Sequence, residues 1–326
     1  MNNKNIIIVN NRIESIDIAK GIGIFLVVFF HCKIGELYYN FHLLAYSFHM
    51  PLFFILAGMC FSTKYSFKEF TLRRVQRLLI PCFFFTLIHV AVLCLLHHNS
   101  IYRDVLVPLP EHIPGALWFL NVLFISEVLC FPIVVKINNN KIKIAIMIGI
   151  GVIGVIVSSI NLNIPQSLGS VPLACFYIML GNMVKPYLKY LVSLKFIVFV
   201  SLLVFWGLFT KVMHVDVHLY DGMSEPIGLS EISSILGVIM CLTFSTRLAG
   251  TRLGGGISLI GKKSLQIMVT HQIFLVSFMT IFWSNDFEHV ETIIYSILQL
   301  AATVGGTYLS VLVIDKKMSW LIGVKK

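Results

Sequence analysis

The chain has 326 residues, of which 57% are hydrophobic and only 12% are charged. Soluble domains carry roughly 25% charged residues, so this composition excludes a water-soluble globular protein and indicates an integral membrane protein. The formal net charge of +10 comes from short basic clusters between apolar runs. Such clusters are typical of membrane topology, so we expect the lipid bilayer, and no nucleic acid, as a partner.

Ten apolar segments approach the roughly 20 residues that a helix needs to cross a bilayer. We therefore expect an all-α integral membrane protein, a bundle of about ten transmembrane helices that forms one domain over residues 1–326. The expected spans are residues 16–37, 41–62, 79–98, 116–135, 144–161, 170–188, 193–211, 229–246, 264–283 and 292–314.

Lysines and arginines are distributed unevenly between the loops that join these spans. All but three of the 25 lie on the side that also holds both termini, and the exceptions are Lys33, Arg103 and Lys211. Because cytoplasmic loops are enriched in lysine and arginine, we expect both termini in the cytoplasm and a multi-pass protein of the cytoplasmic membrane.

Two common kinds of site are not favoured by the sequence. The seven cysteines lie in apolar stretches without a C-x-x-C pair, which predicts buried, unpaired thiols and no metal site. The stretch from Gly256 to Lys262 reads G-x-x-x-x-G-K, but Lys263 stands where a P-loop needs serine or threonine and no strand precedes it. We therefore expect no phosphate-binding P-loop here.

The first expected helix carries two lysines with a histidine between them. Lys20 and Lys33 are 13 residues apart, roughly 20 Å of helix, whereas the hydrocarbon core is about 30 Å thick. Ionisable groups at membrane depth usually face a cavity or pathway, which makes His31 a candidate functional residue. The alternative is that the lysines extend to the interface and that His31 bonds to a backbone carbonyl. A direct dyad of His31 with Glu36 is not expected, because helical geometry separates them.

Other spans also carry polar groups. His49 precedes Pro51 at the start of the second span and either faces a polar cavity or caps an interfacial turn. Trp118 opens the fourth span, as interfacial tryptophans often do. Glu127 and His271 lie at membrane depth, where we expect Glu127 to pair with a basic group.

The loop before the third span contains Arg74 and Arg77, spaced i and i+3. A helical continuation of that span places both guanidinium groups on one face, and arginine binds phosphate in bidentate fashion. The pair is thus a candidate site for a phosphorylated cofactor, although positive-inside topology alone also explains basic residues there.

Taken together, these segments resemble the acyltransferase 3 family of membrane acyltransferases. "SIDIAKGIGIFLVVFFH" resembles the family's first helix, with Lys20 eleven positions before His31, and "RRVQRLLIP" supplies an R-x-x-R as Arg74 and Arg77. "FHMPLFFILAGM", "GALWFL" and "GKKSLQIMVTH" resemble the second, fourth and late helices. The combination is most similar to the fucose 4-O-acetylase-like branch, in which lysine takes the place of a common arginine at position 20.

The resemblance implies transfer of an acyl group, commonly acetyl, from cytosolic acetyl-CoA to a sugar hydroxyl in a bacterial glycan or its lipid-linked precursor. It implies that His31 is a general base and that Lys20 assists it, with Arg74 and Arg77 as CoA ligands and no metal. The residues it implies in the substrate cavity are His49, Asp17, Trp118, Glu127 and His271.

Two other functions remain open from the sequence. Intramembrane charges and helix-breaking residues are also typical of a transporter, although no inverted repeat is evident. A non-catalytic membrane partner in polysaccharide export is the third hypothesis, and it predicts that replacing His31 leaves function intact.

Overall fold

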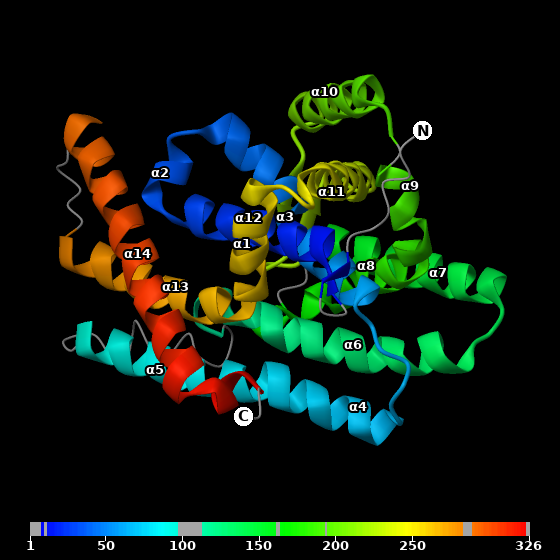
Figure 1. The fold of residues 1–326 in the computed structure, drawn as a ribbon, viewed down its shortest axis with the longest axis horizontal. Coiled ribbons are helices and arrows are strands. Elements are labelled where there is room, and N and C mark those ends of the chain that lie inside the picture. Colours follow the sequence, from blue (N-terminus) through cyan, green and yellow to red (C-terminus); the bar gives the residue numbers. More distant parts are fainter. Residues whose placement is uncertain are drawn as a thin grey trace.

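The computed structural model describes residues 8–9, 12–96, 113–160, 164–192, 194–282 and 289–323. Almost all of this is helix (Figure 1). The helices are α1 (Glu14–His31), α2 (Lys33–Glu36), α3 (Tyr39–Met59), α4 (Phe67–Arg74), α5 (Ile80–Leu96), α6 (Trp118–Lys136), α7 (Asn140–Ser159), α8 (Val171–Val184), α9 (Leu188–Val192), α10 (Phe196–Val212), α11 (Leu229–Leu248), α12 (Arg252–Lys262), α13 (Ser264–Phe282) and α14 (His289–Lys317). A π-helical turn spans Val75–Leu79, and short 3-10 helices span Gly115–Leu117, Pro165–Ser170, Lys185–Tyr187 and Ser319–Ile322. The strands are β1 (Ile8–Val9), β2 (Arg12–Ile13), β3 (Asp216–His218) and β4 (Met223–Glu225).

A helix is found in each of the ten predicted spans, so the all-α membrane fold is confirmed. Within the described ranges, eight helical segments are long and apolar enough to cross a membrane. These segments are Tyr39–Met59, Phe67–Leu96, Gly115–Lys136, Asn140–Ser159, Pro165–Leu191, Leu229–Leu248, Ser264–Phe282 and Val290–Lys317. The other two predicted spans are α1, which carries Glu14, Asp17 and Lys20, and α10, which has 17 residues. A count of ten spans and cytoplasmic termini remain predictions, and Arg103 lies outside the described residues.

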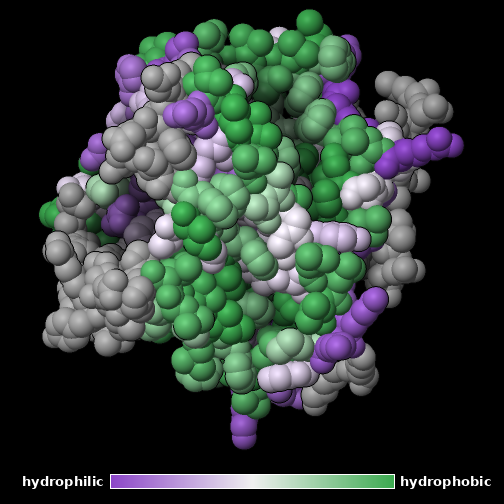
Figure 2. All heavy atoms as spheres, turned by 90° about the vertical axis from the view of Figure 1, so that its left-hand side faces the viewer, coloured by the Kyte–Doolittle hydropathy of each residue, from purple (hydrophilic) through white to green (hydrophobic). Residues whose placement is uncertain are grey.

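Apolar side chains dominate the outside of the bundle as well as its core. Figure 2 shows one side of the molecule, most of which is covered by hydrophobic side chains. On α7, Ile148, Val152 and Ile156 are all about half exposed and follow one another at intervals of four residues, which makes one continuous helix face. Such a face needs lipid or another apolar partner to cover it.

Helix α1 lies at the centre of the bundle and packs against α3, α11, α12 and α13 (Figure 1). Its closest neighbour is α12, because glycines on both helices let the two backbones meet. A Cβ on Gly21 would collide with the carbonyl oxygen of Ile257, and one on Gly261 would collide with that of Asp17. Small residues at a helix crossing are a common device of membrane proteins, and here they fix the end of α12 beside Lys20.

A short hairpin joins α10 to α11 and lies outside the candidate spans. Strands β3 and β4 pair antiparallel, with Val217 opposite Ser224. The buried Glu231, in the first turn of α11, accepts hydrogen bonds from Ser224 Oγ at 2.9 Å, Ser230 Oγ at 3.0 Å and the Gly228 amide at 2.9 Å. One carboxylate therefore fixes the hairpin to the helix that follows it.

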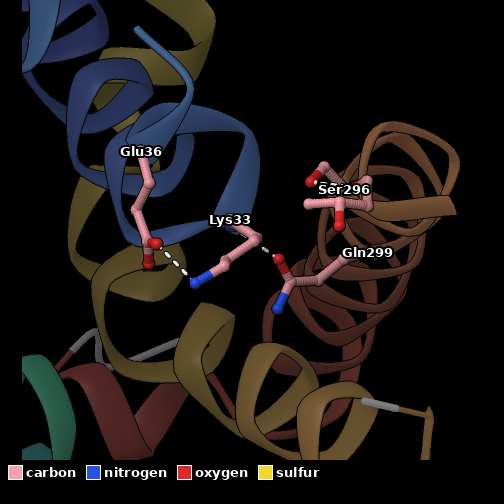
Figure 3. A network of polar contacts seen from close by, with 5 residues as sticks. Lys33, Glu36, Ser296 and Gln299 are labelled. Carbon is pink, nitrogen blue, oxygen red and sulfur yellow. Dashed lines mark hydrogen bonds and ion pairs between the residues drawn. The ribbon is translucent and has the colours of Figure 1, made fainter. Parts of the chain in front are cut away.

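Helix α2 is attached to α14 by polar contacts (Figure 3). The Lys33 amide donates to Gln299 Oε1 at 2.7 Å, and the Lys33 ammonium lies 2.5 Å from the Glu36 carboxylate. Ser296 and Gln299 come from the same stretch of α14 and are both fully buried. Glu36 is thus engaged by Lys33, in agreement with the expectation that it makes no dyad with His31.

Candidate active site

Two cavities enter the bundle near α1 and contain most of the predicted site residues. The first, which we call the arginine cavity, has a volume of about 400 Å³. Its polar lining comes mainly from α1 and from the chain between α3 and α5. The polar residues used below are Lys20, Cys60, Arg73, Arg74, Arg77 and Glu127.

The arginines reach this cavity because α4 continues into α5 through the π-helical turn Val75–Leu79. Helix α4 begins with a capping box in which Ser66 and Glu69 bond to each other's backbone amides. The extra residue of a π-turn rotates the helix locally, and such turns are frequent at functional sites. As predicted, Arg74 and Arg77 face the same space.

The two arginines have different surroundings. Arg74 Nε lies 3.0 Å from Glu127 Oε2, and the side chains are 18% and 3% exposed, respectively. The predicted pairing of Glu127 with a basic group is thus confirmed. Arg77 is exposed at the cavity mouth, and Arg73 lies over the ring of Tyr65 at 4.2 Å. Arg73 and Arg77 are thus exposed guanidinium groups that face this cavity, whereas Arg74 is already held by a carboxylate.

Two cysteines differ from the prediction of buried thiols. Cys60 is exposed and Cys94 is partly exposed, whereas the other five are buried. Helix α3 ends at Met59, so Cys60 is the first residue beyond it, where the chain turns toward α4. Its Sγ lies 3.9 Å from Lys20 Nζ at the mouth of the arginine cavity.

The second cavity, which we call the histidine cavity, has a volume of about 310 Å³. His31 and His49 both line it, from α1 and α3. Trp118 forms another part of its wall. It is only 6% exposed and its ring lies 5.9 Å from that of Tyr220, so it faces the interior and not the membrane interface.

The protonation of His31 follows from its hydrogen bond. Its Nδ1 lies 2.6 Å from the Val27 carbonyl oxygen, one helical turn earlier. A carbonyl can only accept, so Nδ1 carries the proton and, in the neutral ring, Nε2 keeps its lone pair. His49 makes the same contact with the Ala45 carbonyl at 2.9 Å. The alternative that His31 bonds to a backbone carbonyl is thus compatible with a free basic nitrogen at Nε2.

His271 lies beside His31, behind the cavity wall. It is fully buried, and its ring meets that of His31 edge to face at 5.5 Å. Its Nδ1 donates to the carbonyls of Ile267 and Met268, both at 3.0 Å, and its Nε2 has no hydrogen-bond partner. The structure therefore brings His271 to His31 although 240 residues separate them in the chain.

The hairpin adds polar groups at the other side of the histidine cavity. His218, Tyr220 and Asp221 all line it. The Asp216 carboxylate, 3.0 Å from His218 Nε2, raises the pKa of His218 above its ordinary value, and His218 in turn lowers the pKa of Asp216. The Tyr46 ring on α3 lies 5.4 Å from that of His218.

These hairpin groups were not predicted from the sequence, and neither was Gln272 on α13, which also lines the cavity. The only signal of the hairpin was a stretch between two spans, "HVDVHLYDG", in which polar and aliphatic residues alternate. Alternation of that kind is typical of a strand, but it does not say which helices the strand covers.

Met268 lies between the arginine cavity and the histidine cavity. Within the described residues it is the one side chain that lines both, and it is only 4% exposed. Methionine is unbranched and adapts its shape readily. The arginine cavity and the histidine cavity therefore approach each other across a single flexible side chain.

Lys20 and Asp17 complete the set of predicted residues. Lys20 lines the arginine cavity and is eleven residues from His31, about 16 Å along the helix axis. Asp17 is buried one turn earlier and borders a third cavity, on the other side of Lys20. Neither residue lines the histidine cavity.

Comparison with known proteins identifies the family of this chain. A family model described as an acyltransferase domain, that of the acyltransferase 3 family, matches residues 13–314. A curated relative, the nodulation protein NolL of Mesorhizobium japonicum, is 33% identical over 132 residues, which are 37% of this chain and 35% of NolL. The chain thus covers about a third of that relative's length, and no solved structure matches it. Because the family model covers nearly the whole chain, this protein belongs to the acyltransferase 3 family of membrane acyltransferases.

Proposed function

We propose that the protein is an O-acetyltransferase that moves an acetyl group from cytosolic acetyl-CoA to a hydroxyl of a sugar. The acceptor is part of a glycan or of its lipid-linked precursor at the cytoplasmic membrane of a bacterium. The observation that carries this proposal is the meeting of a cationic cavity and a histidine cavity at Met268. An anionic donor suits the first, and a hydroxyl that needs a base suits the second.

The donor enters the arginine cavity from the side of Arg77 and Lys20. Guanidinium and ammonium groups bind phosphate oxygens through charge-assisted hydrogen bonds, so these two residues hold the phosphates of CoA, with Arg74 held ready behind them by Glu127. The apolar walls, which include Phe53, accept the pantetheine arm. The thioester at its end then lies against Met268.

His31 supplies the base. Its Nε2 takes the proton of the acceptor hydroxyl while the oxygen attacks the thioester carbonyl. The C–S bond breaks, and the CoA thiolate takes up the proton that the imidazolium returns. The separation of about 16 Å between Lys20 and His31 supports a role for Lys20 at the donor phosphates and not at the reacting carbonyl.

The walls of the histidine cavity suit a sugar. Trp118 and Tyr220 offer aromatic surface for the apolar face of a pyranose ring. His218, Asp221 and Gln272 offer hydrogen-bond donors and acceptors for its hydroxyls. Such a cavity holds a neutral polyhydroxylated ring better than it holds a hydrophobic acceptor.

The test uses membranes that contain the native acceptor and equal amounts of wild-type protein, His31→Gln or His214→Asn. His214 is exposed and has a positive φ of 48°, which asparagine tolerates, so this variant is a matched control. Radiolabelled acetyl-CoA is supplied on the cytosolic side, and base-labile label in extracted glycans is counted. We expect His31→Gln to lose about 100-fold or more of the rate and His214→Asn to keep it. Equal labelling by all three proteins, or none by any, would remove the catalytic role of His31 and favour the transporter or the non-catalytic partner.

A further inference from the structure

A third cavity, which we call the lysine cavity, opens beside the arginine cavity and has the larger volume of about 890 Å³. Its charged lining comes from five separate parts of the chain. The basic residues are Lys20, Arg77, Lys185, Lys262 and Lys263, and the acidic residues are Asp17 and Asp315. The cavity therefore has a clear excess of positive charge.

One of the two acidic groups is already compensated. Asp315 accepts a hydrogen bond from Lys263 Nζ at 2.6 Å and another from Gln266 Nε2 at 2.7 Å. Lys185 and Lys262 are exposed and come from different elements, the 3-10 turn after α8 and the end of α12. Two ammonium groups that converge on one hollow favour an anionic ligand with at least two negative charges.

The start of α13 adds backbone donors to the same space. Helix α13 has 19 residues and begins at Ser264, and Ser264 and Leu265 line both the lysine and the arginine cavities. The first amides of a helix have no partner within the helix and attract anions. Gln266 is only 3% exposed, and its Oε1, also in the cavity lining, has no hydrogen-bond partner. A buried acceptor of this kind favours a ligand that also offers a hydroxyl or an amine.

The lysine and arginine cavities adjoin each other. Lys20, Cys60 and Arg77 line both. A ligand that fills both cavities would place an anionic, nucleoside-like end among the lysines and further anionic groups near Arg77. A slender uncharged arm would then extend toward Met268. This is the sequence of groups in coenzyme A, in which a 3′-phosphorylated ADP carries the pantetheine arm.

We propose that the lysine cavity is the binding site for the 3′-phosphorylated ADP half of the acyl donor. This inference rests on the proposed use of acetyl-CoA. Lys185 and Lys262 bind the 3′-phosphate, Arg77 and Lys20 bind the diphosphate at the junction, and Gln266 accepts a hydrogen bond from the nucleoside. The short basic clusters around positions 185 and 262 then have a second role beside membrane orientation.

Cys60 gives a direct assay of occupancy, because it is exposed at the junction of the two cavities. The full chain carries Cys94→Ser to remove the other partly exposed thiol, and a maleimide labels Cys60 in membrane vesicles. CoA, dephospho-CoA (which lacks the 3′-phosphate) and adenosine 3′,5′-bisphosphate are each titrated as protecting ligands. The variants are Lys185→Glu, Lys262→Glu and, as a control of equal charge change, the exposed Lys141→Glu on α7.

We expect CoA and adenosine 3′,5′-bisphosphate to slow the labelling of Cys60. In Lys185→Glu and Lys262→Glu the concentration of CoA that halves the rate should rise about tenfold or more, the ratio that corresponds to one lost hydrogen bond to a charged group. Protection by dephospho-CoA should change much less, and Lys141→Glu should match the wild type.

Two results would overturn the proposal, and they differ in what else they overturn. If CoA protects Cys60 equally in all variants, the nucleotide lies elsewhere, and the acetyl-CoA-dependent function stands. If CoA gives no protection in the wild type, the donor does not occupy these cavities, and the proposed function fails together with this site.

Discussion

The ion pair between Arg74 and Glu127 in the arginine cavity can be tested by measuring how much it contributes to stability. Two unit charges 3.0 Å apart attract each other by about 5 kcal/mol at an effective dielectric constant of about 20, and the cost of desolvating the nearly buried Glu127 offsets part of this. Breaking a buried pair by removing one partner typically costs about 3–5 kcal/mol.

The two single variants should differ because the partners differ in exposure. Arg74→Ala leaves a carboxylate buried without its cation, so we expect a loss of about 3–4 kcal/mol in unfolding free energy. Glu127→Gln leaves Arg74 with its contact to the Phe70 ring at 4.9 Å and with access to the cavity, so we expect about 1–2 kcal/mol. The double variant should lose about 2 kcal/mol less than the sum of the two single losses.

The measurement is a double-mutant cycle on the full chain in mixed micelles, unfolded by titration with a denaturing detergent. Arg73→Ala is the control, since Arg73 is exposed and its contact with Tyr65 is worth about 1 kcal/mol or less. Losses that add within about 0.5 kcal/mol would refute the argument, because they would mean that the two charges do not interact in the folded protein.

Three further predictions concern the wall, the hairpin and the crossing of α1 with α12. Met268→Trp should block the junction and lower acetyl transfer at least about tenfold while CoA still protects Cys60, whereas Met268→Leu should keep most of the rate. Asp216 raises the pKa of His218, so the pair stabilises the fold below pH about 6.5, and this stabilisation is lost as the pH rises through the raised pKa. The difference in melting temperature between the wild type and Asp216→Asn should therefore shrink from pH 6 to pH 9. The pair is exposed, so it contributes less than about 1 kcal/mol to the free energy of unfolding. Gly261→Ala should lower the free energy of unfolding by about 1–3 kcal/mol, because its Cβ would meet the backbone of Asp17. Gly256→Ala on the same helix has open space around it and should be neutral or stabilising.

The helices were predictable because long apolar runs have few other stable conformations in a bilayer. Each predicted span therefore holds a helix, and the spacing of Arg74 and Arg77 placed both on one face. Helical periodicity says which residues share a face, but not which helix lies opposite. The contact of Arg74 with Glu127 joins residues 53 positions apart, and that of His31 with His271 joins residues 240 positions apart, so only tertiary packing reveals them.

The mistaken or missing predictions lie at the ends of elements. Cys60 was expected to be buried as part of a span, but α3 ends one residue before it. Lys185 and Lys262 stand at helix ends, where positive-inside topology already explained them. His218 and Asp221 belong to a hairpin whose position over the histidine cavity depends on Glu231 in α11. At such positions a side chain has the same local pattern whether it faces solvent or a cavity.

The spacing of Lys20 and His31 is the feature in which sequence and structure agree most closely. Eleven residues make just over three full turns of an α-helix, so both side chains lie on one face of α1, with Lys20 at the arginine cavity and His31 at the histidine cavity. Adding one residue between them would rotate His31 by about 100° and turn it away from the histidine cavity. A single helix, held in place by α12 through Gly21 and Gly261, thus sets the separation of the two residues and, on the proposed function, the distance that the acyl donor must span.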